Sequence, residues 1–138
     1  MKTSPAGLQF IEDNEGSSLI EYKDIAGKWS IGVGHLIVPP ESYPDGITEE
    51  ECLALLAGDV AHVENALNAL IPEDCTQNQF DACTDFGFNL GVGALRTMLG
   101  HGWGQVPVQM PRWDMADGQT IPGLAARRRR EVDLFSMS

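Results

Sequence analysis

Two stretches of the chain repeat hydrophobic residues with the spacing of one helix face. In the first stretch these positions are Leu56, Val60, Val63, Leu67 and Leu70. Each stretch begins at a threonine, Thr48 or Thr76, and a Glu or Gln three residues later completes a capping box. Pro72 ends the first pattern and Gly91 the second. The pattern therefore predicts helical structure from about residue 48 to residue 91.

The beginning of the chain predicts one helix followed by extended sequence. Ser4 and the proline after it form a typical helix start, and Gly16 is a typical stop, so we expect an N-terminal helix over residues 5–15. Residues 19–24 and 29–35 then have strand character and are separated by a short connection. We interpret these two segments as a β-hairpin.

These elements predict an α+β fold in a single domain over residues 1–138. A small β-hairpin lobe would cover about residues 17–47 and a larger helical lobe residues 48–138. Shorter helices are expected over residues 94–99 and 124–135. We expect a cleft between the two lobes, because ligands commonly bind at such boundaries.

Charge is distributed unevenly along the chain. The formal net charge is −11, which argues against a general nucleic-acid-binding protein. Residues 1–94 hold 16 acids and 3 bases, whereas residues 95–138 hold 4 acids and 6 bases. Four of these bases form the run Arg127–Arg130. The run is either a solvated helix face that pairs with Glu131 and Asp133, or a basic rim that meets an anionic polymer.

The cysteines and histidines do not fall at metal-ligand spacing. They are Cys52, Cys75, Cys83, His35, His62 and His101. We expect reduced cysteines within the fold, no metal site and no cofactor. No stretch approaches the roughly 18 apolar residues of a membrane span, and the N-terminus lacks the pattern of a signal peptide. These features predict synthesis in the cytoplasm and no direct membrane insertion.

Glu15 has the local properties of a general acid. Glycoside hydrolysis requires a protonated carboxylic acid for the leaving oxygen and a second carboxylate across the bond. Glu15 lies in the last turn of the predicted helix, where the partial negative charge of the helix end disfavours ionisation. Partial burial against the hairpin would raise its pKa further. The alternative is an ordinary exposed glutamate.

Asp24 and Ser30 are candidates for holding an attacking water. Asp24 ends the first predicted strand, and Ser30 lies on the return strand on the same face as Gly32 and Gly34. A face without side chains would let a flat sugar approach the backbone. The alternatives are a turn aspartate that bonds to nearby backbone and a solvated strand hydroxyl.

The segment that contains these three residues resembles the signature of the phage-type lysozymes, the muramidases found in tailed-phage endolysins. Its matching positions are Glu15-Gly16, Leu19, Tyr22, Asp24, Gly27, Ser30-Ile31-Gly32 and Gly34-His35. A second block covers residues 76–82 and continues through 86–93. A third covers residues 111–113 and 121–135. The three blocks keep the family's order, and the resemblance implies a lysozyme-like fold.

The resemblance also implies a role for each catalytic candidate. Glu15 would be the general acid and Asp24 the base that activates a water, with Ser30 helping to position that water. The family inverts the anomeric configuration, which requires a gap of about 6.5–9.5 Å between the two carboxyl groups. The family usually has threonine at position 30, so the β-methyl that restricts the hydroxyl rotamer is missing here. We expect some loss of activity from this difference.

Other matched positions imply substrate contact or structural support. Leu36 and Phe88 match family positions that line the saccharide cleft. His35 matches a structural histidine, for which we expect a satisfied polar contact. The Arg/Glu cluster near the C-terminus is interpreted as structural pairing.

The implied function is hydrolysis of the β-1,4 bond between N-acetylmuramic acid and N-acetylglucosamine in bacterial peptidoglycan, which lyses the host. Peptidoglycan glycan strands would be the partner, the protein would be a monomer, and release to the periplasm would depend on a separate holin-type protein. Three alternatives remain open. They are a lytic transglycosylase, a catalytically weak or silent peptidoglycan-binding module with the same fold, and a toxin or tail-associated enzyme.

Overall fold

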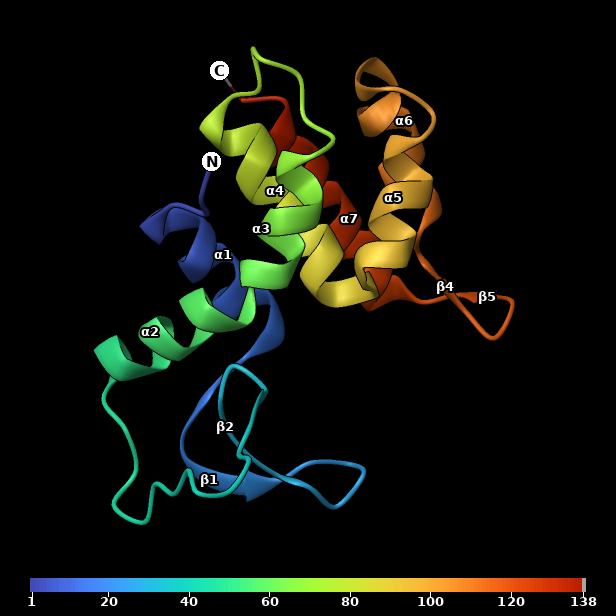
Figure 1. The fold of residues 1–138 in the computed structure, drawn as a ribbon. Coiled ribbons are helices and arrows are strands. Elements are labelled where there is room, and N and C mark those ends of the chain that lie inside the picture. Colours follow the sequence, from blue (N-terminus) through green and yellow to red (C-terminus); the bar gives the residue numbers. More distant parts are fainter. Residues whose placement is uncertain (138) are drawn as a thin grey trace. The chain divides into compact units, whose positions relative to one another are not determined.

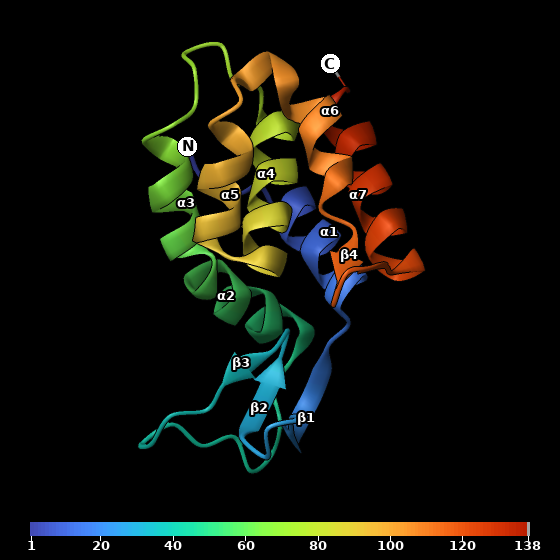
Figure 2. The ribbon, with the colours of Figure 1, turned by 90° about the vertical axis from the view of Figure 1, so that its right-hand side faces the viewer.

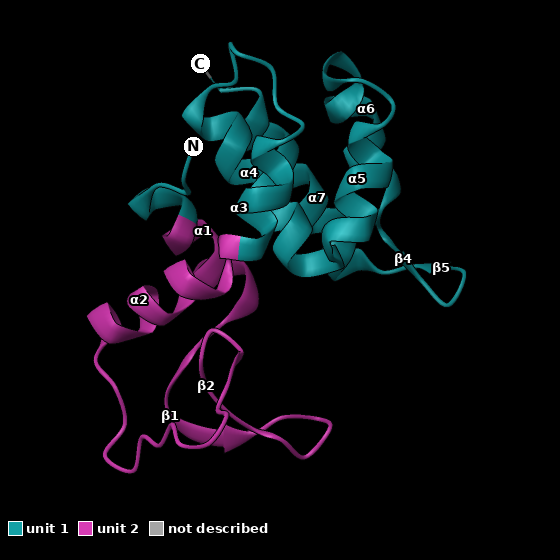
Figure 3. Ribbon diagram, viewed as in Figure 1, with its two compact units in different colours: residues 1–7, 62–138 teal, residues 8–61 magenta. Residues whose placement is uncertain are grey.

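The computed structural model describes residues 1–137 and divides the chain into two compact units (Figures 1 and 3). Unit 2 comprises Leu8–Ala61. Unit 1 comprises Met1–Gly7 and the chain from His62 onward. The first helix therefore begins in one unit and ends in the other. The helix over residues 49–59 belongs to the hairpin's unit, whereas the sequence assigned it to the helical lobe. The single-domain organisation stays a prediction.

Unit 2 contains a three-stranded antiparallel sheet and two helices. They are α1 (Pro5–Glu15), β1 (Ser18–Lys23), β2 (Trp29–Gly32), β3 (His35–Leu36) and α2 (Glu49–Asp59). The strand order is β1-β2-β3, and α2 packs against β2. The predicted N-terminal helix and hairpin are confirmed. The return strand was predicted as one segment, but a turn at Val33 and Gly34 splits it, and Gly34 has a φ of +65°.

The register of this sheet determines which side chains share a face. Tyr22 pairs with Ser30, and Ser30 also pairs with Leu36, so these three residues lie on one face. Trp29 pairs with Lys23 and belongs to the opposite face. The buried hydrophobic residues of unit 2 are Ile11, Ile31, Val33, Ile47, Cys52, Leu56 and Val60.

Unit 1 is a helical assembly around α4 (Gln77–Leu90), which contacts both α5 (Val92–Leu99) and α7 (Pro122–Phe135) (Figure 2). Its other elements are α3 (Ala61–Asn68), η1 (Trp103–Gln105), α6 (Val106–Gln109), η2 (Met110–Arg112), β4 (Met115–Ala116) and β5 (Gln119–Thr120). The core of unit 1 includes Phe80, Phe86 and Leu95, all fully buried. The elements between α5 and α7 were not predicted, since they are too short to show a hydrophobic period.

The hydrophobic pattern from Leu56 to Leu70 runs across two helices rather than one. Helix α2 ends at Asp59, and α3 begins at Ala61. Gly58 and Asp59 favour helix poorly and lie just before the break. Spacing alone did not reveal the break. Both capping boxes, at Thr48 and Thr76, are confirmed.

The arginine run on α7 is partly buried. The Arg127 guanidinium makes a bidentate contact with Asp85, at 3.0 and 2.8 Å. Arg128 Nε lies 2.6 Å from Glu131 Oε1, and both side chains are fully buried. The expected solvated face is therefore wrong for Arg127 and Arg128, while the pairing of the run with Glu131 is confirmed. Arg129 and Arg130 are exposed.

The three cysteines are free, as expected, with Cys52 and Cys83 buried and Cys75 half-buried. Within residues 1–137, no helix combines the length and hydropathy that a membrane crossing requires.

Candidate active site

A cavity of about 350 Å³ in unit 2 contains the predicted general acid. Its lining residues are Glu15, Gly16, Ser17, Ser18, Tyr22 and Gly34. They come from the end of α1, the start of β1 and the turn between β2 and β3. The cavity lies within the roughly 300–1,000 Å³ range of small-molecule sites.

The chain reverses direction directly after Glu15, which is the last residue of α1. The Gly16 N–H donates to the Glu12 carbonyl at 2.7 Å, and Gly16 has a φ of +79°, which favours glycine. The residue Glu15 is exposed, so its expected partial burial is wrong. Its predicted position at the helix end is confirmed.

Glu12, one turn before Glu15, anchors this corner of the unit. Its buried carboxylate accepts from Gln9 Nε2 at 2.9 Å and from the Cys52 thiol at 3.4 Å. Burial raises the pKa of Glu12, but hydrogen bonds from Glu49, Gln9, Cys52 and Ser17 outweigh it and lower the pKa overall. Ser17 lines the cavity, and Glu49 and Cys52 belong to α2. The hydrogen bonds of Glu12 with these residues therefore link the cavity wall to α2.

Asp24 is a turn aspartate that bonds to nearby backbone, which was one of the two interpretations of its sequence position. Its Oδ1 accepts from the Lys28 N–H at 2.9 Å, and its own N–H donates to the Lys28 carbonyl at 2.8 Å. The Gly27 N–H donates to the Asp24 carbonyl at 2.9 Å. The aspartate therefore closes the β1–β2 turn, and the Lys28 N–H orients its carboxylate. Its catalytic role stays a prediction.

Ser30 is buried, with 3% of its surface exposed, so the interpretation as a solvated hydroxyl is wrong. The two glycines grouped with it behave differently. Gly34 lines the cavity, whereas a Cβ on Gly32 would lie 3.5 Å from the Cys52 sulfur, so that position faces α2. Of these two glycines, Gly34 alone lies on the cavity wall, and the close approach of a sugar to it stays a prediction.

Tyr22 is a neighbour of each of the three catalytic candidates, in the structure or along the chain. It lines the cavity with Glu15 and pairs with Ser30, and Asp24 follows it by two positions along the chain. Asp24 and Ser30 are not among the lining residues of that cavity. From the sequence, Tyr22 was noted only as part of the family motif. Strand alternation from Asp24 was the signal that could have identified it as a lining residue.

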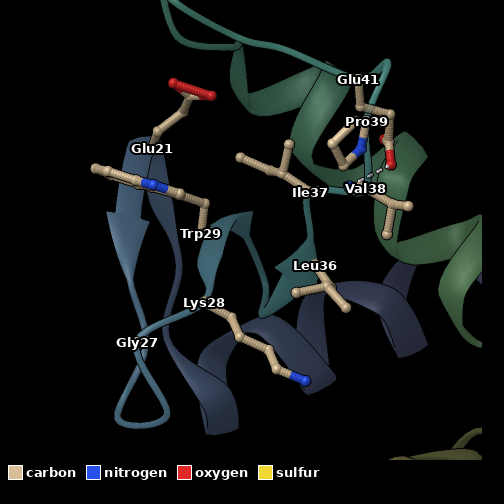
Figure 4. A pocket seen from close by; sticks show the side chains of 9 residues that line it. All are labelled: Glu21, Gly27, Lys28, Trp29, Leu36, Ile37, Val38, Pro39 and Glu41. Carbon is tan, nitrogen blue, oxygen red and sulfur yellow. Dashed lines mark hydrogen bonds between the residues drawn. The ribbon is translucent and has the colours of Figure 1, made fainter.

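The two predicted substrate-binding residues lie in different units. Leu36 is 43% exposed and lines a second cavity of about 560 Å³ together with Trp29 (Figure 4). Phe88 is a half-buried residue of α4 in unit 1. The predicted cleft that both would line stays a prediction.

His35 makes the satisfied polar contacts expected of a structural histidine. Its Nδ1 lies 2.8 Å from Asp59 Oδ2, and its Nε2 lies 2.8 Å from Glu41 Oε2. Burial lowers the pKa of His35, but hydrogen bonds to Glu41 and Asp59 outweigh it and raise the pKa overall. The hydrogen bond with His35, with help from the Val38 N–H and the Tyr43 hydroxyl, lowers the pKa of Glu41 to about 2.

One group of side chains has donor atoms close enough together for a metal ion. The candidate ligand atoms of Glu12, Glu49 and Cys52 lie within 4.8 Å of one another. Burial raises the pKa of Cys52 to about 12, so its thiol keeps the proton that it donates to Glu12. Hydrogen bonds inside the group account for this arrangement, and the absence of a metal site stays a prediction.

Comparisons with known proteins agree with the family resemblance. Residues 12–131 match the family model described as phage lysozyme. The chain is 35% identical to the endolysin of Acyrthosiphon pisum secondary endosymbiont phage 1, over 98% of each chain. It is 33% identical to the endolysin of Bacillus phage PZA, over 99% of this chain but only 55% of the relative's length.

A solved structure supports the fold. The crystal structure of a point mutant of P22 lysozyme superposes with a TM-score of 0.86 at 32% identity, and the match covers 99% of both chains. The α+β lysozyme-like fold is therefore confirmed.

Proposed function

This chain belongs to the phage lysozyme family and is a muramidase, a glycoside hydrolase that degrades peptidoglycan, and we propose that it cleaves the β-1,4 bond between N-acetylmuramic acid and N-acetylglucosamine. One observation carries the proposal. Glu15 lies at the end of α1 on the wall of a sugar-sized cavity, inside the segment that matches the family model.

In the proposed reaction, the Glu15 carboxylic acid donates its proton to the leaving glycosidic oxygen. Asp24 acts as a base and removes a proton from a water that attacks the anomeric carbon from the opposite face, which inverts its configuration. The backbone contact to Asp24 Oδ1 holds the carboxylate in one orientation while the reaction proceeds. The Ser30 hydroxyl helps to position the water.

We further propose that the protein acts as a monomer on peptidoglycan strands during host lysis. We also propose that it is synthesised in the cytoplasm and released to the periplasm by a separate holin-type protein.

A lytic transglycosylase is the second candidate. This reaction needs the acid but not a water-activating carboxylate, and Asp24 and Ser30 do not line the cavity that contains Glu15. Product analysis separates the two reactions, since hydrolysis leaves a reducing end and transglycosylation leaves a 1,6-anhydro sugar.

A turbidity assay on permeabilised Gram-negative cells tests the proposal. Glu15→Gln should clear the suspension at least about 10²-fold more slowly than wild type, because it removes the proton donor. Asp13→Asn is the matched control, since it neutralises an exposed acid of the same helix. Equal clearing by wild type and Glu15→Gln would remove Glu15 as the acid. Absence of clearing by wild type would favour a silent binding module.

A further inference from the structure

The cavity around Trp29 is larger than the one that contains Glu15, and the catalytic proposal does not use it. It has a volume of about 560 Å³ and lies entirely within unit 2. In Figure 4, Glu21 and Trp29 are neighbours, and Ile37 points toward them from the segment that follows β3. Val38 and Glu41 continue the wall.

The walls of this cavity are fixed by hydrogen bonds. The Ile37 N–H donates to the Trp29 carbonyl at 3.0 Å, and the Tyr43 N–H donates to Glu21 Oε2 at 3.2 Å. Glu41 accepts from the Val38 N–H at 3.1 Å (Figure 4). A ring nitrogen of His35 lies 2.8 Å from the same carboxylate. A wall that is already held in place reduces the ordering cost of binding a ligand.

Trp29 presents an aromatic ring to solvent at the cavity. The residue is 51% exposed, and the Lys23 ammonium lies 5.3 Å from the ring centroid. Val38, another lining residue, is 54% exposed, so the cavity presents two large apolar side chains to solvent. Register places Trp29 on the sheet face opposite Ser30. Leu36, which pairs with Ser30, also lines this cavity, but the cavity shares no lining residue with the one that contains Glu15, so the two sites differ.

We propose that the Trp29 cavity is a second saccharide-binding site, which holds a neutral N-acetylated amino-sugar segment of a glycan strand away from the bond being cleaved. The choice of polymer rests on the proposed function. The indole ring offers a flat apolar surface for the C–H face of a pyranose. The Glu21 and Glu41 carboxylates offer acceptors for sugar hydroxyls and amide N–H groups, and Ile37 and Val38 offer apolar contact for an acetyl methyl.

Charge selects a neutral ligand over an anionic one. The wall carries charges of both signs, because the Lys28 ammonium lines it together with the Glu21 and Glu41 carboxylates. Unit 2 as a whole is acidic, since residues 8–61 hold eleven acidic residues against Lys23 and Lys28. A polyanion would be repelled by this surface. The sugar backbone of peptidoglycan carries no charge where each lactyl group is joined to a stem peptide, so it meets this requirement.

Binding experiments in the Glu15→Gln background test the site without turnover. The probes are β-1,4-linked N-acetylglucosamine hexamer in solution and purified peptidoglycan sacculi. Titration of labelled protein with the hexamer should shift the Trp29 indole N–H and the Ile37 and Val38 amide signals. Trp29→Ala should weaken binding to sacculi about tenfold, a typical effect of removing one dominant aromatic contact.

Two further variants guard against indirect effects. Val38→Glu adds charge and bulk to an exposed wall residue outside the sheet, and it should weaken binding even if Trp29→Ala disturbs the hairpin. Ile25→Ala is the matched control, because Ile25 is a fully exposed apolar residue of the β1–β2 turn that does not line the cavity. It should bind like the parent.

The outcomes separate this inference from the proposed function. Unchanged Trp29, Ile37 and Val38 signals, or unchanged affinity in both wall variants, would overturn the second site even if wild type clears cells. Signals that shift with protein concentration alone would identify a second copy as the occupant and also overturn it. Shifts at Trp29 in a protein whose wild type clears no cells would reject the proposed function and leave the site standing.

Discussion

Acidic side chains serve different purposes in the two units. In unit 2, Glu15 is exposed on a cavity wall, and Asp24 closes a turn at the edge of the sheet. In unit 1, Asp85 and Glu131 are completely buried against Arg127 and Arg128. Glu15 is therefore accessible to a ligand, whereas Asp85 and Glu131 stabilise the fold together with their arginine partners. We therefore expect substitution of Asp24 to alter activity more than stability, and loss of the Arg127 partner of Asp85 to do the reverse.

Arg127→Met should have the largest effect on stability. It leaves the Asp85 carboxylate buried without its bidentate partner, which should lower the free energy of unfolding by about 3–5 kcal/mol. Urea denaturation measures the change, and Arg129→Met, at an exposed neighbour, is the control. An unchanged unfolding midpoint would break the contrast between the units.

Asp24→Asn should have the next largest effect, this time on activity. We expect at least about a 10²-fold loss in clearing rate, because the substitution removes the base. The melting temperature should stay near that of wild type, since asparagine retains Oδ1 as the acceptor for the Lys28 N–H. Asp24→Ala separates the two roles, because it loses the turn contact as well. Full activity in Asp24→Asn would leave the turn as the only role of this residue.

His35→Asn should lower the melting temperature by roughly 5 °C near pH 6, because it breaks two charge-assisted contacts. The folded-state pKa of His35 is raised, so its stabilisation is complete below its ordinary pKa of 6.5 and is lost as the pH rises through the higher folded value. The difference between wild type and variant should therefore shrink from pH 6 to pH 9.

The lowered pKa of Glu41 affects stability at acidic pH. It is lowered from 4.5 to about 2, so the stabilisation it contributes is present above 4.5 and is lost as the pH falls toward 2. The His35–Glu41 pair should therefore stabilise the protein most between pH 4.5 and pH 6.5, where both groups are charged. His101→Asn, at an exposed position, is the control and should show no such profile. A pH-independent difference for His35→Asn would contradict the charged pair.

Ser30→Thr should have the smallest effect. The strand position suits a β-branched residue, and the added methyl restricts the hydroxyl rotamer. We expect activity to stay equal or to rise by no more than about threefold, equivalent to roughly 0.6 kcal/mol in barrier height. An inactive but folded Ser30→Thr protein, measured by turbidity and circular dichroism, would refute the assigned role of the hydroxyl.

Local signals in the chain predicted much of the fold. The N-terminal helix, both capping boxes and the left-handed Gly16 each depend on residues within one or two turns. The break at Val60 was not visible, because hydrophobic spacing continues through it. The burial of Arg127 was also not visible, since four consecutive arginines are typical of a solvated face and the partner Asp85 is 42 residues away.

The sequence by itself determined the N-terminal helix, the two capped helix starts at Thr48 and Thr76, and the hairpin, because these depend on neighbouring residues. The family pattern added the catalytic candidates Glu15, Asp24 and Ser30. Only the tertiary structure decided that Tyr22, Ser17 and Gly34 share a wall with Glu15, and that Trp29 opens onto a separate cavity. The physical reason is that each cavity is formed by several short elements whose relative placement local sequence does not specify. Its shape depends on strand register and on hydrogen bonds such as those of Glu12 and Glu41.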